Sequence, residues 1–223
     1  MRTYLPDIDV SDVVHALSSQ DWSVIERKIQ NQQYERLGLD RALAIASDLL
    51  MQHQKLTGLK ILDVGCNNGL VAKVLSALGC VVVGIDNSDV DTQGLYIGLG
   101  DQLHSLGFEF QPKDLADFLD SDERHWDCIL MLSVMHHWET GYAMSGERRY
   151  SDEKIRQLLE DLFRRSRLCI YYECPRNEPG FKAGSGIDFL LRHCSELPKI
   201  RYLGNTVGPN GYLRDFWALD TEC

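Results

Sequence analysis

Residues 61 to 69 read Ile-Leu-Asp-Val-Gly-Cys-Asn-Asn-Gly, and this stretch decides the fold. It begins as an apolar strand, passes an acidic residue at Asp63 and then turns on two glycines, Gly65 and Gly69. Because glycine has no Cβ, it adopts positive φ and lets a ligand come close to the main chain. The stretch is therefore predicted to be a loop that binds a nucleotide-type cofactor.

The loop is followed by a predicted helix and then by a predicted strand that ends at an acidic residue. Residues 70–78 have the apolar periodicity of a helix, Gly79 ends it, and residues 81–85 form an apolar, β-branched run that leads to Asp86. An acidic residue about twenty positions after a glycine loop is placed to accept both ribose hydroxyls of an adenosine. Asp86 is therefore predicted to bind a ribose, and the alternative is a surface turn that includes Asn87.

Length and composition are those of one ordinary domain, with 223 residues of which 44% are hydrophobic. Residues 1–57 are predicted to form a helical preface and residues 58–223 the core. No stretch is long and apolar enough to predict a membrane span, and the N-terminus lacks the apolar stretch of a signal peptide, so the expected location is cytoplasmic. The net charge of −10 argues against long nucleic acid as a partner.

The seven cysteines are odd in number and scattered, and no Cys-x-x-Cys pair occurs. Cys80, Cys128 and Cys169 fall inside predicted strands, where a reduced thiol acts as a small hydrophobic group. We therefore expect no metal site, no disulfide framework and a reducing compartment. The sequence does not indicate an oligomeric state.

Helices and strands alternate along the chain, which predicts a doubly wound α/β fold. The final two strands are joined by Gly208-Pro209-Asn210-Gly211 and form a hairpin, so the seven-stranded sheet is expected to be mostly parallel with one antiparallel strand. The helices are predicted near 11–19, 22–30, 32–53, 70–78, 88–105, 115 onward, 152–165 and 186–194, and the strands near 61–63, 81–85, 108–111, 128–132, 168–172, 200–203 and 212–219.

Ligands of such sheets lie beyond the carboxyl ends of the strands, and two adjacent histidines follow the fourth strand. His136 and His137 are predicted to be catalytic, since an imidazole accepts a proton from a hydroxyl or an amine near neutral pH. The alternative is structural: one histidine caps the strand end while Trp138 covers the cofactor.

Basic residues are concentrated in two segments that border the same edge. Residues 142–150 and a segment of predicted flexible chain, 173–186, together form a candidate lid over a bound substrate. Their guanidinium and ammonium groups suit phosphate or carboxylate, which favours an anionic substrate, and the alternative is a solvated loop with ordinary surface charges. The predicted substrate-binding residues are Arg148, Arg149, Arg176 and Lys182.

The spacing Asp63-x-Gly65-x-x-x-Gly69 resembles motif I of the class I S-adenosylmethionine-dependent methyltransferases, and the resemblance covers residues 58–219. It implies S-adenosylmethionine as cofactor. In that family an acidic side chain after the third strand, here Asp114, bonds the adenine amino group, and the next backbone amide meets the ring. The resemblance places the cofactor against Asp63, Gly65, Cys66, Gly69, Leu70, Asp86, Asn87, Asp114, Leu115, Leu132 and Ser133.

A weaker likeness lies in the Leu-Ser-Val-x-His-His run at 132–137 and in Gln33-Tyr34-Glu35-Arg36-Leu37. Both resemble the methyltransferase domain of bacterial enzymes that terminate polysaccharide chains by methylating a terminal phosphate. The likeness implies that Arg36, or else Arg41, holds the methionine carboxylate of the cofactor. This chain departs from those enzymes by a longer loop after Trp138, and no kinase domain is expected after it.

The sequence therefore predicts an O-methyltransferase of an anionic small molecule or a phosphorylated glycan. Three alternatives stay open: an N- or C-methyltransferase of a neutral metabolite, a non-catalytic binding subunit, and a nucleotide-dependent oxidoreductase. The oxidoreductase would need the G-x-G-x-x-G fingerprint, but Asn67 occupies the place of its second glycine. A binding subunit would usually have a damaged cofactor loop, and this loop is intact.

Overall fold

The computed structural model describes residues 39–67, 69–87, 107–141, 149–176, 186–207 and 213–221. The chain divides into two compact units, residues 1–115 and residues 116–223. This division does not coincide with the predicted boundary after residue 57, which stays a prediction. The helices predicted near 11–19, 22–30 and 88–105 lie outside the described residues, as does the first part of the helix predicted at 32–53.

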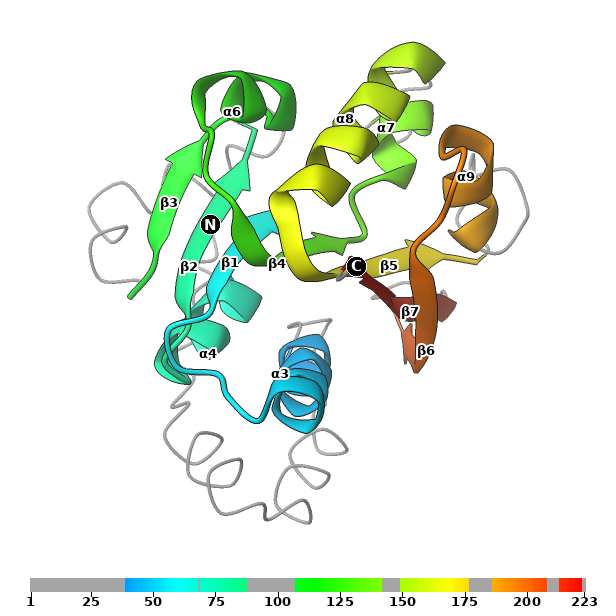
Figure 1. Ribbon diagram of the computed structural model, residues 1–223. Helices are drawn as coiled ribbons and strands as arrows, with labels where there is room; N and C mark the ends of the chain where they lie inside the picture. The colour runs from blue at the N-terminus through cyan, green and yellow to red at the C-terminus, as the bar shows by residue number, and fades with distance from the viewer. Residues whose placement is uncertain are drawn as a thin grey trace, which may run out of the picture. The chain divides into compact units, whose positions relative to one another are not determined.

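Unit 1 contains three parallel strands in the order β3-β2-β1, which lie side by side in Figure 1. β1 and β2 are buried along nearly their whole length. Because both faces of such strands are covered, their sequences are mostly apolar runs and do not alternate between apolar and polar residues. α3 and α4 pack against each other, and α4 also packs against β2. The elements are α3 (Leu39–His53), β1 (Lys60–Val64), α4 (Leu70–Ala77), β2 (Val81–Asp86) and β3 (Glu109–Pro112).

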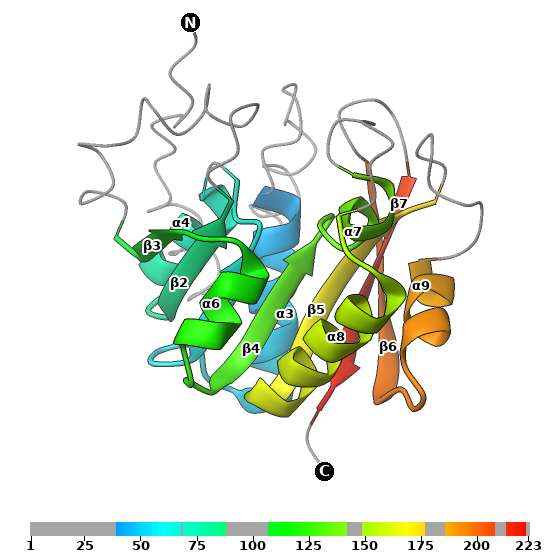
Figure 2. The same ribbon diagram turned by 90° about the horizontal axis from the view of Figure 1, so that it is seen from above.

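Unit 2 contains four strands in the order β4-β5-β7-β6. β4 and β5 are parallel, whereas β7 is antiparallel to both of its neighbours, and Figure 2 shows it running opposite to β5. α8 packs against β5 and α9. The elements are α6 (Leu115–Ser121), β4 (Trp126–Leu132), α7 (His136–Thr140), α8 (Asp152–Arg165), β5 (Ser166–Pro175), α9 (Gly186–His193), β6 (Lys199–Val207) and β7 (Leu213–Asp220). The boundary between the units falls after Leu115, the first residue of α6.

The seven strands belong to one sheet, and β7 is its antiparallel strand. The predicted fold class, a doubly wound and mostly parallel seven-stranded sheet, is confirmed. Three predicted details differ from the structure. β5 continues to Pro175, so the segment predicted to be flexible begins too early; α7 was not predicted; and Cys80 precedes β2, although it is buried like Cys128 and Cys169.

α8 shows how the sequence specifies a helix in this fold. Ser151 caps it by accepting a hydrogen bond from the amide of Lys154, with acidic residues in the first turn and arginines in the last, as the helix dipole favours. Its buried positions recur every three or four residues and face β5 and α9. They are Ile155, Leu158, Leu159 and Leu162.

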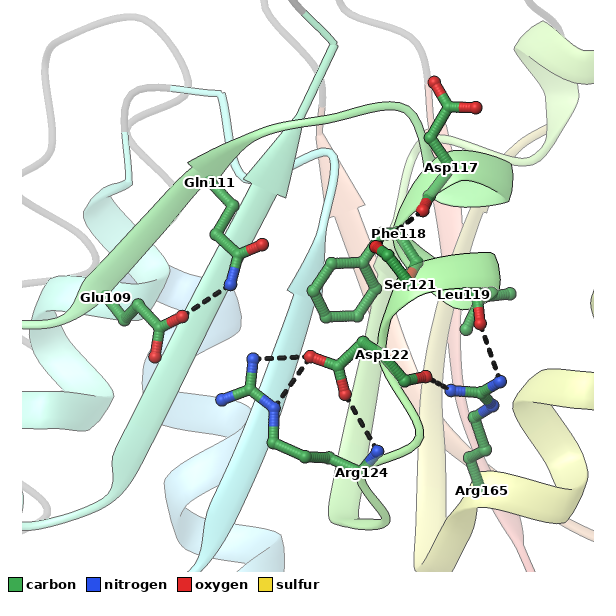
Figure 3. Close-up of polar contacts among 9 residues, drawn as sticks. All are labelled: Glu109, Gln111, Asp117, Phe118, Leu119, Ser121, Asp122, Arg124 and Arg165. Carbon is green, nitrogen blue, oxygen red and sulfur yellow. Dashed lines mark hydrogen bonds and ion pairs between the residues drawn. The ribbon is translucent and has the colours of Figure 1, made fainter.

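Arg165, the last residue of α8, secures the end of α6 (Figure 3). Its guanidinium is buried and donates to the backbone carbonyls of Leu119, at 2.8 Å, and Asp122. Carbonyls at the end of a helix lack intrahelical partners, so this side chain satisfies them from the neighbouring helix. The Asp122 carboxylate in turn accepts hydrogen bonds from the amide and the Nε of Arg124.

None of the helices in the described part of the chain combines the length and the apolar character needed to cross a membrane.

Candidate functional site

Three of the described residues in the glycine loop between β1 and α4 have the left-handed conformation. Gly65, Asn67 and Gly69 have φ values of 67°, 50° and 70°. The positive φ predicted at both glycines is confirmed. The amides of Gly65 and Cys66 donate to the carbonyl of Ile85 at 2.8 and 3.0 Å, so the loop is anchored to the end of β2.

Asn67 closes the loop onto the second strand. Its backbone amide donates to the Oδ2 atom of Asp86 at 2.8 Å. Asparagine tolerates the left-handed conformation better than other residues with a Cβ, so this loop turns without a glycine at that position. The structure therefore brings Asp86 to the glycine loop, as predicted, and shows that one of its two carboxylate oxygens holds the loop itself.

Phe108 is a neighbour of this loop that the sequence did not predict. A Cβ built on Gly69 would lie 2.5 Å from the Cζ atom of Phe108, and one built on Gly84 would lie 3.1 Å from its Cε2 atom. The absence of a side chain at Gly69 therefore lets the phenyl ring of Phe108 approach the backbone of the loop. A phenylalanine directly before a strand gives no signal by which this contact could have been found from sequence.

Asp63 lies at the base of the loop and is almost fully buried. Burial raises the pKa of this carboxyl from 3.8 to about 7, the nearby Arg41 guanidinium lowers it, and the Asp86 carboxylate raises it. Arg41, the second candidate for the cofactor's carboxylate, is thus close enough to act electrostatically on Asp63. Arg36, the first candidate, lies outside the described residues.

The remaining predicted cofactor residues lie at or after the ends of four strands, β1 to β4, and their contacts with the cofactor stay predictions. Asn87 directly follows β2. Asp114 directly precedes α6, a position from which an aspartate can also cap the helix. The apolar members of the set are buried, so they would meet a cofactor through backbone groups: Cys66, Leu70, Leu115 and Leu132.

In unit 2, a tight turn joins β4 to α7. Ser133 stands in the left-handed conformation with φ of 61°, and its amide donates to the carbonyl of Glu173 at 3.0 Å. The two histidines follow with their ring centroids 3.9 Å apart. His136 is only 2% exposed, whereas His137 is half-buried, so His137 is the more accessible of the two.

Trp138 is a core residue of unit 2. It is 3% exposed, and its ring makes edge contacts with Tyr150 and Phe189, at centroid distances of 5.9 and 6.4 Å. Its packing therefore stabilises α7 against the start of α8 and against α9. The alternative in which Trp138 covers a cofactor gains no support from these contacts.

The two described members of the predicted basic set differ in their surroundings. Arg176 is engaged by the buried carboxylate of Asp215, with Nε 2.8 Å from Oδ2 and Nη2 bonded to Oδ1, and Nη2 also reaches Asn205 at 3.3 Å. The hydrogen bond to Asp215 raises the pKa of Arg176. Arg149 is exposed, and its guanidinium lies over the ring of Tyr150. Arg148 and Lys182 lie outside the described residues.

One group of side chains in the described ranges has the geometry of a possible metal site. Glu139, Asp152 and His193 offer ligand atoms that lie within 4.8 Å of one another. However, the Glu139 carboxylate is already paired, with Arg192 at 2.8 Å on one oxygen and His193 Nε2 at 2.9 Å on the other. We interpret the group as an ion-pair network that ties α7, α8 and α9 together.

Residues 30–140 match the family model described as a methyltransferase domain. Among curated proteins, the chain is similar to a ubiquinone biosynthesis O-methyltransferase of Maricaulis maris, with 29% identity over 46% of this chain and 39% of that protein. The chain thus spans about two fifths of the length of this relative. These matches confirm the predicted resemblance to the class I S-adenosylmethionine-dependent methyltransferases.

Solved structures show the same fold. The bifunctional kinase-methyltransferase WbdD matches with a TM-score of 0.59 and 20% identity, over 82% of this chain and 39% of that chain. Magnesium protoporphyrin IX methyltransferase (ChlM) of Synechocystis PCC 6803, solved with bound SAH, matches with a TM-score of 0.56 and 19% identity, over 95% of this chain and 99% of that chain. The weaker likeness, to enzymes that join a methyltransferase and a kinase, is confirmed at the level of the fold.

Proposed function

We propose that this chain transfers the methyl group of S-adenosylmethionine to an oxygen atom of its acceptor. The observation that carries this proposal is the left-handed loop at Gly65, Asn67 and Gly69, closed by the hydrogen bond from Asn67 to Asp86. In doubly wound sheets an acidic side chain at the end of the second strand binds the ribose of an adenosine, and Asp86, which ends β2 and is bonded to this loop, is our candidate for that role.

Methyl transfer from S-adenosylmethionine is an in-line displacement at the methyl carbon. The acceptor oxygen forms the new C–O bond, the C–S bond breaks, and its electron pair returns to sulfur to give S-adenosylhomocysteine. An acceptor hydroxyl also loses its proton to a base, whereas an acceptor that is already an anion needs none. The protein contributes the positioning of both reactants and, for a hydroxyl acceptor, the base.

His137 is the better of the two predicted bases. Its ring is half-buried and therefore accessible to an acceptor, whereas His136 is 2% exposed. The backbone of α7 begins with the bonds from His137 to the carbonyl of Val134 and from Trp138 to that of Met135. These bonds hold the backbone at His137, and the burial of Trp138 anchors the residue that follows it.

Oxygen is the proposed acceptor atom because the curated relative from Maricaulis maris is an O-methyltransferase. The finer proposal is an anionic acceptor, a small molecule or a phosphorylated glycan, attracted by basic side chains of an otherwise acidic protein. Among the described candidates, Arg149 is better placed than Arg176 to meet such an anion. It is exposed, while Arg176 forms a two-point ion pair with a buried carboxylate.

The test of the proposed function is a turnover screen with the purified protein and S-adenosylmethionine. Phosphorylated sugars, carboxylates, phenols and amines are offered as acceptors, and release of S-adenosylhomocysteine is measured. We expect turnover with an oxygen acceptor and binding of S-adenosylhomocysteine without binding of NAD. Binding of NAD instead of S-adenosylhomocysteine would support the alternative that the protein is an oxidoreductase. Binding of S-adenosylhomocysteine without turnover of any acceptor would support the alternative that it is a non-catalytic binding subunit.

The anionic acceptor has its own test, a pair of matched arginine variants. Arg149→Gln should raise the Michaelis constant of an anionic acceptor severalfold, and the constant should rise with salt because exposed charges are screened beyond about 8 Å at physiological ionic strength. Arg156→Gln, which removes an exposed arginine of α8 paired with Glu153, is the control and should have no such effect. Efficient turnover of a neutral acceptor that is insensitive to both changes would contradict the anionic proposal and favour a neutral metabolite.

A further inference from the structure

Glu173 is a fully buried carboxylate near the carboxyl end of β5. Both of its oxygens accept hydrogen bonds from hydroxyl groups, Oε2 from Ser133 and Oε1 from Thr206. Its backbone carbonyl also accepts from the amide of Ser133, at 3.0 Å. Glu173 thus binds Ser133 through both the main chain and the side chain.

Ser133 has a conformation that needs such support. Its φ of 61° places it in the left-handed region, which residues with a Cβ, apart from asparagine and aspartate, rarely adopt because of the steric cost. A residue keeps a strained conformation where its surroundings over-determine it, and these residues concentrate at functional sites. Here the two bonds to Glu173 fix Ser133 at the one position where the chain reverses from β4 into α7.

The direction of α7 depends on this turn. Met135 already has helical dihedral angles, with φ of −61°, and His136 and His137 follow directly. Few residues separate Ser133 from the histidine rings, so a change in its φ would redirect them. Glu173, with 0% exposure, has no access to reactants of its own.

We propose that Glu173 is a positioning residue for methyl transfer, which acts through Ser133 by holding the left-handed turn that directs His137. The proposal rests on the proposed function and adds to it a buried residue that supports the reaction without contact with the acceptor. Thr206 is the third member of the cluster, since its hydroxyl fixes the other oxygen of the same carboxylate.

Two variants of Ser133 separate this role from general stability. Ser133→Ala removes the hydroxyl but keeps the cost of the left-handed conformation, whereas Ser133→Gly removes the hydroxyl and the cost together. We expect Glu173→Gln and Ser133→Ala to lower kcat by about tenfold, with the affinity for S-adenosylhomocysteine changed less than about threefold. Ser133→Gly should restore most of the lost kcat in the Glu173→Gln background, because glycine adopts the turn unaided.

The position of the His137 ring gives a readout that does not depend on turnover. In wild-type protein and in the variants without ligand, NMR shifts of the His137 ring protons should move on Glu173→Gln and return on adding Ser133→Gly. Unchanged ring shifts and kcat in Glu173→Gln would overturn the proposal even if the wild type transfers methyl groups. Loss of kcat that Ser133→Gly does not restore, with a parallel loss of thermal stability, would also overturn it. Absence of turnover in the wild type would refute the proposed function alone, since the ring shifts still report on the turn.

Discussion

The carboxylate of Asp86 accepts a hydrogen bond of 2.8 Å from the backbone amide of Asn67, nineteen residues earlier in the chain. This bond joins the tip of β2 to the middle of the glycine loop. It gives Asp86 two tasks, since one oxygen holds the loop while the carboxylate is also the predicted partner of the ribose. The two tasks can be separated by experiment.

Asp86→Asn is the variant that separates them. Its side-chain carbonyl can still accept from the amide of Asn67, but the negative charge and one acceptor are lost. We expect S-adenosylhomocysteine to bind about tenfold or more weakly, the worth of one lost hydrogen bond to a charged group. Calorimetry measures this, with Glu109→Gln at an exposed position of β3 as the control for loss of one negative charge. Equal affinity in the folded Asp86→Asn protein would remove Asp86 from the cofactor site.

Local features of this site could be predicted from sequence because they depend on neighbours in the chain. The spacing of Gly65 and Gly69 predicted their positive φ, and the apolar run after them predicted that β2 would end at Asp86. Asn67 was interpreted only as the residue in place of a second glycine. Its own left-handed conformation follows from the same chemistry and could have been predicted, since asparagine adopts positive φ more readily than most residues.

Contacts between distant segments could not be predicted in this way. Glu173 is bonded to Ser133 across 40 residues and to Thr206 across 33, which requires the register of four strands, β4, β5, β7 and β6. The short α7 gives too few residues for helical periodicity to be seen. Arg176 was expected in a flexible segment that binds the acceptor. It directly follows β5, however, and the hairpin of β6 and β7 supplies its partner, Asp215.

Gly69 and Gly58 allow the steric contribution of Phe108 to be separated from the backbone cost of placing alanine at a left-handed position. Both have positive φ, 70° and 82°, but a Cβ on Gly58 would meet no atom within 4 Å, whereas one on Gly69 would meet Phe108 at 2.5 Å. We expect Gly58→Ala to lower the free energy of unfolding by about 1 kcal/mol, the backbone cost alone. Gly69→Ala should cost about 1 to 3 kcal/mol more, because the phenyl ring must move.

Denaturant unfolding measures both variants. Adding Phe108→Leu to Gly69→Ala should recover part of the extra loss, whereas the same change in the wild type should only destabilise, by removing ring contacts. Equal losses in Gly69→Ala and Gly58→Ala would show that Phe108 does not lie over the loop in solution.

Asp63 should make the stability of the protein depend on pH. Burial raises its pKa from 3.8 to about 7, so the folded protein holds this proton more tightly than the unfolded chain does. The stability that the protonated Asp63 carboxyl provides, relative to the ionised form, is therefore fully present below about pH 4 and is lost as the pH rises to about 7. Where only the folded state holds the proton, the slope is about 1.4 kcal/mol per pH unit.

Asp63→Asn removes this titration. Relative to that variant, the wild type should lose about 3 kcal/mol of unfolding free energy between about pH 5 and pH 8, measured by urea unfolding. Glu109→Gln, at an exposed position, should show no comparable difference across the same range. A wild-type protein whose difference from Asp63→Asn stays constant with pH would mean that the Asp63 carboxyl is ionised throughout.

His137 should carry the proton transfer if the acceptor is a hydroxyl. His137→Gln keeps a polar side chain of similar reach but cannot act as a base near neutral pH, so kcat should fall by about a hundredfold while the affinity for S-adenosylhomocysteine stays nearly the same. Because only the neutral form of a base accepts a proton, kcat of the wild type should depend on pH, and this dependence should be lost in His137→Gln.

Two other histidines provide the comparisons. His125→Gln, at an exposed position before β4, should leave kcat and its pH profile unchanged. His136→Gln replaces a rigid ring by a flexible amide side chain at a position with 2% exposure, so we expect its main effect in thermal stability, with kcat lowered less than in His137→Gln. If His136→Gln proves to be the slower enzyme at a temperature where both variants are folded, the base is His136. If neither variant loses activity, the acceptor reacts as an anion and the histidine pair serves only to build α7.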